Sequence, residues 1–110
     1  MTYKGRVQFD ALRSLAFGSI SGTYAALGGP FSHEASIIVL SNLTDVSITF
    51  SVDGVTDNLL IPSNGFKLFD FTTNRAVDLT PLLLASGTQF YAKGTPSSGS
   101  VILEVIYGVV

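Results

Sequence analysis

The sequence contains no cysteine and no tryptophan, and the missing cysteine excludes two classes of structure. Without thiols there is neither a disulfide framework nor a thiolate metal site, so an apolar core must hold the fold together. The 110 residues fit one domain, which buries roughly 65% of its unfolded surface and therefore has room for a single core. A chain without cysteine also fits synthesis in the reducing cytoplasm of a cell.

Charged residues are scarce as well, since Asp, Glu, Lys and Arg make up 13% of the chain against about 25% in an average soluble domain. Hydrophobic residues make up 46%, yet no run approaches the ~20 apolar residues of a membrane-spanning helix, and we expect no membrane binding. A small domain with so few charges would leave apolar patches exposed. We therefore expect other copies of the chain, or a partner, to cover much of the surface. The alternative is a soluble monomer with a surface rich in Ser, Thr and Asn.

The net charge of −2 gives no general attraction for nucleic acid, and we expect no specific nucleic-acid binding. Half of the basic residues nevertheless fall near the N-terminus, namely Lys4, Arg6 and Arg13. We predict a basic N-terminal arm at 1–9, which lacks the apolar segment of a secretory signal, and a β-sandwich domain at 10–110. Within the arm, Val7 and Phe9 could begin a strand, dock on a neighbouring subunit or belong to a frayed tail.

The clearest strand signal is Val46–Val52, in which apolar residues alternate strictly with Ser and Thr. This alternation is typical of a strand buried on one face, with its hydroxyl groups on the solvent side. Asp53-Gly54 is a turn pair that ends the strand. Ala35–Leu40 is apolar on both faces, and the polar connection Ser41–Asp45 predicts a hairpin between the two strands.

Two further predicted strands carry apolar residues on both sides. In Gly65–Phe71, Phe66 and Leu68 share one side while Phe69 and Phe71 share the other, so that both sides need cover unless a bulge switches the face. Ser100–Tyr107 directs its odd-numbered residues to the core and its isoleucines outward, where they also need cover. The remaining predicted strands are Asp10–Ile20, where glycines and serines disfavour a helix, Tyr24–Leu27, Leu59–Ile61 and Gln89–Lys93. Thr72–Ser86 is predicted to be a loop with one helical turn at Asp78–Leu83.

Together these elements predict an all-β fold. About seven to eight short strands, with turn signals every eight to twelve residues or so, are typical of a single antiparallel β-sandwich of the jelly-roll or immunoglobulin-like type. A small barrel gives a similar pattern and is the alternative.

A search for catalytic and metal-binding residues finds no constellation. His33 is the single histidine, and its neighbour Glu34 would point the other way along an extended segment. Gly18–Gly22 has Ile20 where a nucleophile elbow needs serine. Three residues lie close together without the spacing of a calcium loop and are expected to form turns, namely Asp53, Asp57 and Asn58. We predict that the protein is not an enzyme and has no cofactor and no metal site.

Turn and strand signals recur at Asn42–Asp45 (NLTD), Ser51–Gly54 (SVDG), Leu60–Gly65 and Phe69–Asn74 (FDFTTN), and the last strand closes with Tyr107-Gly108. In this order they resemble a group of small bacteriophage virion proteins. In that group an N-x-T-D turn leads into a strand that ends near S-x-D-G, and a D-x-T-x-N segment follows. Leu15–Gly18 and Gly22–Leu27 fit the same pattern, so that the resemblance spans most of the chain.

The resemblance implies a structural subunit of a phage particle and supplies no catalytic residues. We expect a non-enzymatic virion protein, made in the host cytoplasm, that forms homo-oligomers and binds the major capsid protein or other virion proteins. The leading hypothesis is a capsid decoration or cement protein. The first alternative is a neck or tail component, such as a head–tail adaptor or collar subunit. A carbohydrate-binding module is a further alternative, although the chain has no tryptophan.

The expected interface combines the basic arm with apolar strand residues that have no evident place in the core. These residues are Lys4, Arg6, Val7, Phe9, Ile38, Phe69, Phe71, Ile102 and Ile106.

Overall fold

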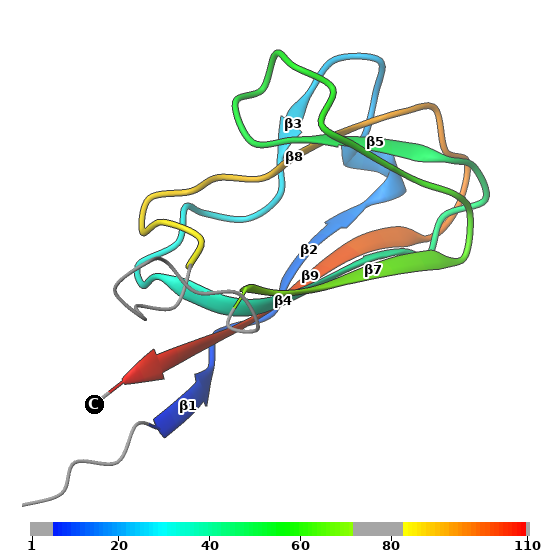
Figure 1. The fold of residues 1–110 in the computed structure, drawn as a ribbon. Helices are drawn as coiled ribbons and strands as arrows, with labels where there is room; N and C mark the ends of the chain where they lie inside the picture. Colours follow the sequence, from blue (N-terminus) through cyan, green and yellow to red (C-terminus); the bar gives the residue numbers. More distant parts are fainter. Residues whose placement is uncertain (1–5, 72–82, 110) are drawn as a thin grey trace, which may run out of the picture.

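The computed structural model describes residues 6–71 and 83–109, over which nine strands form two antiparallel sheets. The sheets lie in two layers, as Figure 1 shows, and confirm the predicted all-β sandwich. The larger sheet contains β1 (Arg6–Phe9), β2 (Arg13–Ala16), β4 (Ala35–Asn42), β7 (Gly65–Asp70) and β9 (Ser100–Val109). The smaller sheet contains β3 (Ala25–Ala26), β5 (Ile48–Ser51), β6 (Leu59–Ile61) and β8 (Tyr91–Lys93). The predicted helical turn at 78–83 lies almost entirely outside the described residues.

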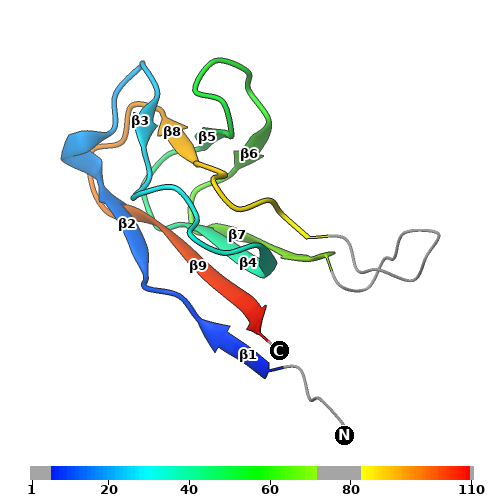
Figure 2. The same cartoon turned by 90° about the vertical axis from the view of Figure 1, so that its left-hand side faces the viewer.

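The long strand β9 organises the larger sheet. One of its edges pairs with β4, and the other pairs first with β2 and then with β1. Between β1 and β2 the Asp10 N–H donates to the Val105 carbonyl at 2.9 Å, so that the chain stays close to β9. Residues 6–9 of the predicted arm are therefore a strand of the sheet, and Figure 2 shows β1 beside the C-terminal end of β9.

The core lies between the sheets and follows the period of two along each strand. The predicted inward residues of β9 are buried, and so are Ile48 and Phe50 of β5. Tyr107 is the exception in β9, since it is half-buried. The buried apolar residues are Ile20, Leu27, Phe31, Ala35, Ile38, Leu40, Ile48, Phe50, Ile61, Phe90, Ala92, Val101, Leu103 and Val105.

The predicted hairpin between the segments 35–40 and 46–52 is wrong. Strand β4 pairs with β7 and β9, whereas β5 pairs with β6 and β8 in the opposite sheet. The connection crosses between the layers because its polar side chains are buried and bind backbone groups there. The Asn42 amide donates to the carbonyls of Val46 at 2.8 Å and Ile61 at 2.9 Å, and its oxygen accepts the Thr44 N–H at 2.9 Å.

The strand predicted at 46–52 is shorter, and its last hydroxyl residue is covered by the loop that follows. Ser51 is buried and its hydroxyl donates to the Asp53 carboxylate at 2.7 Å, while Val52 is exposed at the start of the following loop. Ser51 lies opposite Tyr91, on the predicted side away from the core, but it is not open to solvent because the loop covers it and supplies its hydrogen-bond partner. The segment 10–20 also divides, since β2 is followed by the 3₁₀ turn η1 (Phe17–Ser19).

Candidate functional site

The outer side of the larger sheet, which faces away from the core, carries a largely apolar surface. Residues directly opposite each other in an antiparallel ladder point to the same side of the sheet. Ile106 lies opposite both Phe9 and Ile37, so all three share the side opposite to the core. The outer apolar face, as we name it, consists of Val7, Phe9, Ile37, Val39, Phe66, Leu68, Ile102 and Ile106.

Four members of this face are largely open to solvent. The exposed fractions are 79% for Phe9, 67% for Phe66, 67% for Val7 and 58% for Leu68. A fully exposed phenylalanine side chain presents ~200 Å², so the two phenylalanines alone expose roughly 300 Å². The largest apolar patch on a typical monomer is about 300–600 Å² and is often functional. The outer apolar face is therefore a candidate interaction surface.

Two carboxylates interrupt this surface among the described residues. Glu104 is exposed and lies opposite Val39, in the middle of the sheet. Asp70 lies opposite Ile37, at the β7 edge. Charge on the face is therefore acidic.

The residues predicted to form the interface divide into four groups. Val7, Phe9, Ile102 and Ile106 lie on the outer apolar face. Ile38 is 2% exposed and belongs to the core, because the register turns Ile37 outward instead, and this corrects its assignment to a surface. Lys4 lies outside the described residues, and Arg6 lies in β1.

The two remaining predicted interface residues, Phe69 and Phe71, are half-buried on the core side. They line an open, mainly apolar pocket of about 240 Å³ between the sheets, together with Phe90 and Leu84. Sequence reasoning missed four members of the outer apolar face, namely Ile37, Val39, Phe66 and Leu68. The available signal was the alternation of Phe66 and Leu68, but the pattern does not tell which side of β7 meets the core.

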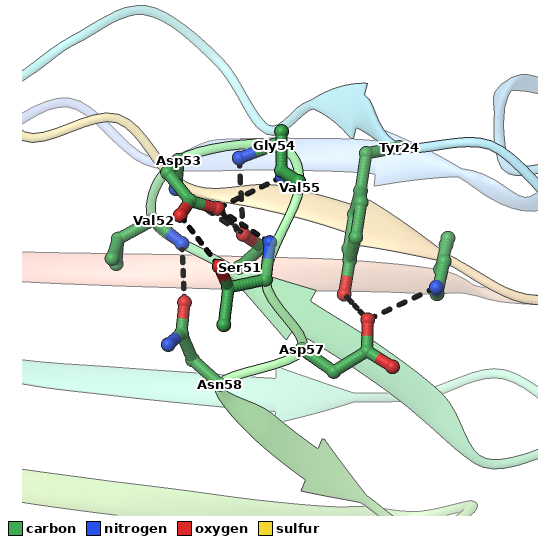
Figure 3. A network of polar contacts seen from close by, with 10 residues as sticks. Tyr24, Ser51, Val52, Asp53, Gly54, Val55, Asp57 and Asn58 are labelled. Carbon is green, nitrogen blue, oxygen red and sulfur yellow. Dashed lines mark hydrogen bonds and ion pairs between the residues drawn. The ribbon is translucent and has the colours of Figure 1, made fainter.

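The loop between β5 and β6 is held by its own side chains, as Figure 3 shows. The Asp53 carboxylate accepts the N–H groups of Thr56 at 2.7 Å and Val55 at 2.8 Å. These hydrogen bonds hold the pKa of Asp53 well below its usual range, and the bond from Thr56 is the largest cause. Asn58 accepts the Val52 N–H at 2.9 Å, so the predicted turn roles of Asp53 and Asn58 are confirmed. No group of three or more possible metal ligands occurs among the described residues.

A second polar cluster joins three elements at the same end of the molecule. The Tyr24 hydroxyl donates to Asp57 at 2.6 Å, and the Lys93 ammonium lies 3.0 Å from the same carboxylate oxygen. Lys93 also lies 4.7 Å from the centre of the Tyr24 ring. Beside Asp57, an open pocket of about 300 Å³ is lined by Thr49, Asp57, Asn58, Leu59 and Leu60.

The titration of Tyr24 provides a test of this cluster. Burial raises the pKa of Tyr24 to about 12, and the hydrogen bond to Asp57 adds to the shift. The unfolded chain loses this proton near pH ~10, so the stability that is linked to the Tyr24 proton is fully present below about pH 10. It should disappear as the pH rises from about 10 to about 12. Ultraviolet difference absorbance of wild type against Tyr24→Phe measures the midpoint directly.

Asp57→Asn is the matched variant for this titration. It should lower the midpoint of Tyr24 only partly, because burial is the larger cause of the shift. A wild-type Tyr24 midpoint near ~10 would contradict the arrangement.

The single histidine has a packing role. The His33 ring stacks on Tyr107 with centres 4.0 Å apart and planes inclined by 5°. The Tyr107 hydroxyl in turn donates to Gln8 at 3.0 Å, so that these contacts connect β1 and β9 to the segment before β4. That His33 has no catalytic role remains a prediction.

The fold and its surface define a β-sandwich with an exposed apolar sheet face. No family model matches the chain, and no curated protein matches it. Among solved structures it is similar to the Dit protein of phage SPP1, presented as a paradigm of the hub adsorption apparatus in phages that infect Gram-positive bacteria. The sequences are 9% identical, the TM-score is 0.41, and the match covers 94% of this chain and 49% of the other. The chain thus spans about half the length of that protein.

At this identity and TM-score the likeness identifies neither a family nor a function. In the described part of the chain, no helix is long and apolar enough to cross a membrane.

Proposed function

We propose that this protein is a non-enzymatic structural component of a phage virion that assembles with copies of itself and binds other virion proteins. The outer apolar face is the observation that carries the proposal. Phe9 and Phe66 stand in solvent on a sheet whose other side already forms the core, so they add nothing to folding of the isolated chain. An assembly that covers them stabilises the folded chain, because a partner that binds only the folded state favours that state by mass action. The turn and strand signals that resemble small virion proteins support the same function.

Within the virion, the leading proposal is a capsid decoration or cement protein. Copies joined through the outer apolar face present two sets of the same loops, such as the loop at 52–58, and this arrangement suits attachment across neighbouring capsid subunits. The alternative is a neck or tail component, such as a head–tail adaptor or collar subunit, in which the same face would contact neighbouring subunits of a ring.

Purified particles test this proposal. We expect mass spectrometry to find the protein in phage particles from infected cells, and immunogold labelling to distribute over the capsid. Labelling at one vertex or on the tail would favour the alternative position. Absence from purified particles would exclude a virion role altogether.

The residues responsible are tested by supplying variants during infection. Phe66→Ser combined with Leu68→Ser should lower incorporation at least about tenfold, because anchor residues dominate interfaces. Val55→Ser is the matched control, since Val55 is 82% exposed in the loop at 52–58 and lies off the face. Equal incorporation of both variants would remove the face from the proposal.

A carbohydrate-binding module is supported by a different observation. The pocket beside Asp57 combines carboxylate, amide and hydroxyl groups with the apolar side chains of Leu59 and Leu60. Hydroxyl-rich ligands use such mixed surfaces, with hydrogen bonds for orientation and apolar contact for affinity. Selective binding on a glycan array that Asp57→Ala abolishes and Glu104→Gln preserves would establish this class instead.

A further inference from the structure

We propose that the occupant of the outer apolar face is a second copy of this chain, whose larger sheet packs face to face on the first. The inference rests on the proposed function for the use of this face as an interface, and it names the partner. It concerns the purified protein in solution and can therefore be tested without particles.

The dimensions of the face suit a stable dimer. Four strands lie side by side in the order β1–β9–β4–β7, and β9 is 10 residues long. With strands ~4.8 Å apart and ~3.3 Å per residue, the face measures roughly 20 by 30 Å. The face is thus about 600 Å² in projection, and specific interfaces bury ~800 Å² of accessible surface on each partner, so one such contact needs the whole face and its rim. Two sheets stacked ~10 Å apart bury this surface as a sandwich core does.

The distribution of large side chains makes the face complementary to itself. Phe9 lies at the β1 edge in the row of Ile106, and Phe66 lies at the β7 edge in the row of Ile102. These two positions are diagonally opposite corners of the face. The other diagonal carries Ser14, opposite Ile102, and Asp70 in the row of Ile106.

A two-fold axis in the plane of the interface, along or across the strands, exchanges the two diagonals. Each phenylalanine corner of one copy then meets a serine or aspartate corner of the other, so that the bulky corners do not collide. Such an isologous contact closes as a dimer, because the same patch is used on both subunits.

Glu104 distinguishes a second copy from an unrelated partner. Its exposed side chain lies in the middle row of the face, between the two diagonals. In the dimer two Glu104 carboxylates lie near the axis and repel each other. A partner with a basic surface would instead be attracted to this charge. Neutralising Glu104 therefore strengthens self-association and weakens binding to a basic partner.

Sedimentation velocity over a range of concentrations tests the proposal with the full chain. We expect a reversible monomer–dimer equilibrium that Glu104→Gln tightens at least about threefold, through removal of like charges at close range. Phe66→Ser with Leu68→Ser should weaken dimerisation about 100-fold, since buried anchors carry most of the association energy. Val55→Ser should leave it unchanged, and circular dichroism should show that all variants keep the fold.

Each contrary outcome rules out a specific part of the dimer proposal. A monomer at every concentration overturns self-association, whereas detection in particles would still support the virion role. A dimer that resists the Phe66 and Leu68 substitutions, or that Glu104→Gln weakens, overturns this face as its contact. A dimer with the expected responses stands even if the protein is absent from particles.

Discussion

Replacing Gly99 by alanine should destabilise the protein by about 4 kcal/mol or more, which is enough to unfold many domains of this size. Gly99 has a φ of 87°, a conformation that L-residues avoid. A Cβ atom at this position would lie 2.0 Å from the Leu43 carbonyl oxygen and 2.8 Å from the Leu43 carbonyl carbon. Both atoms belong to the backbone, so no side-chain rotation relieves the overlap.

Hydrogen bonds on both sides of Gly99 keep its backbone close to the Leu43 carbonyl. The Leu43 N–H donates to the Ser100 carbonyl at 2.9 Å, and the Phe17 N–H donates to the Gly99 carbonyl at 3.0 Å. The start of β9 is thus held between the end of β4 and the turn η1. A shift that makes room for a methyl group must break at least one of these hydrogen bonds.

Gly87 provides the matched control for this substitution. Its φ is 88°, but no described atom lies within 4 Å of the place that a Cβ atom would take, so Gly87→Ala carries only the backbone strain, about 1 kcal/mol. Urea denaturation of both variants measures the difference in unfolding free energy. Equal losses for the two variants would show that the overlap at Gly99 is relieved elsewhere.

The strands that depend on local pattern were predictable from the sequence. In β5 apolar residues alternate with polar ones, and in β9 the odd-numbered residues are predicted to face the core; one side of each strand is buried as expected, with Ile48 and Leu103 as examples. A period of two is a property of neighbouring residues and needs no knowledge of the partner strand. The turn roles of Asp53 and Asn58 were predictable for the same reason, since their side chains bind backbone within their own loop.

The pairing of strands was not predictable in this way. The connection at 41–45 has the composition of a hairpin turn, but Asn42 and Thr44 are buried between the layers. The two residue types indicate a turn. Their burial depends on a hydrogen bond from Asn42 to the carbonyl of Ile61, which lies far along the sequence. A long-range contact of this kind leaves no local signature.

The candidate surface was only partly predictable because it depends on register. Ile37 and Ile38 are adjacent and identical, yet one faces out and the other lies in the core. A shift of one residue would exchange them, and the sequence pattern is the same in both cases. The same ambiguity exists in β7, where the pattern does not tell whether Phe66 and Leu68 or Phe69 face the core. Only the pairing of β7 with β4 places Phe69 on the core side.

The second large effect is expected for Asn42→Ala, which should destabilise the protein by about 3 kcal/mol or more. The Asn42 side chain is fully buried at the point where the chain leaves the larger sheet. Its amide holds the Val46 and Ile61 carbonyls, and its oxygen accepts both the N–H and the hydroxyl of Thr44, at 2.9 and 2.6 Å. Alanine leaves buried polar groups without partners and opens a cavity at the crossing.

Asn58→Ala is the matched control, because Asn58 is exposed and its side-chain oxygen accepts the Val52 N–H at 2.9 Å on the surface of the loop. Water can replace that bond, so the expected loss is about 0.5 kcal/mol. Urea denaturation should therefore place the midpoint of Asn42→Ala far below that of Asn58→Ala with little change in slope. If the two midpoints coincide, Asn42 does not hold the crossing between the sheets. Apolar packing around Ile61 would then have to direct β4 and β5 into separate layers.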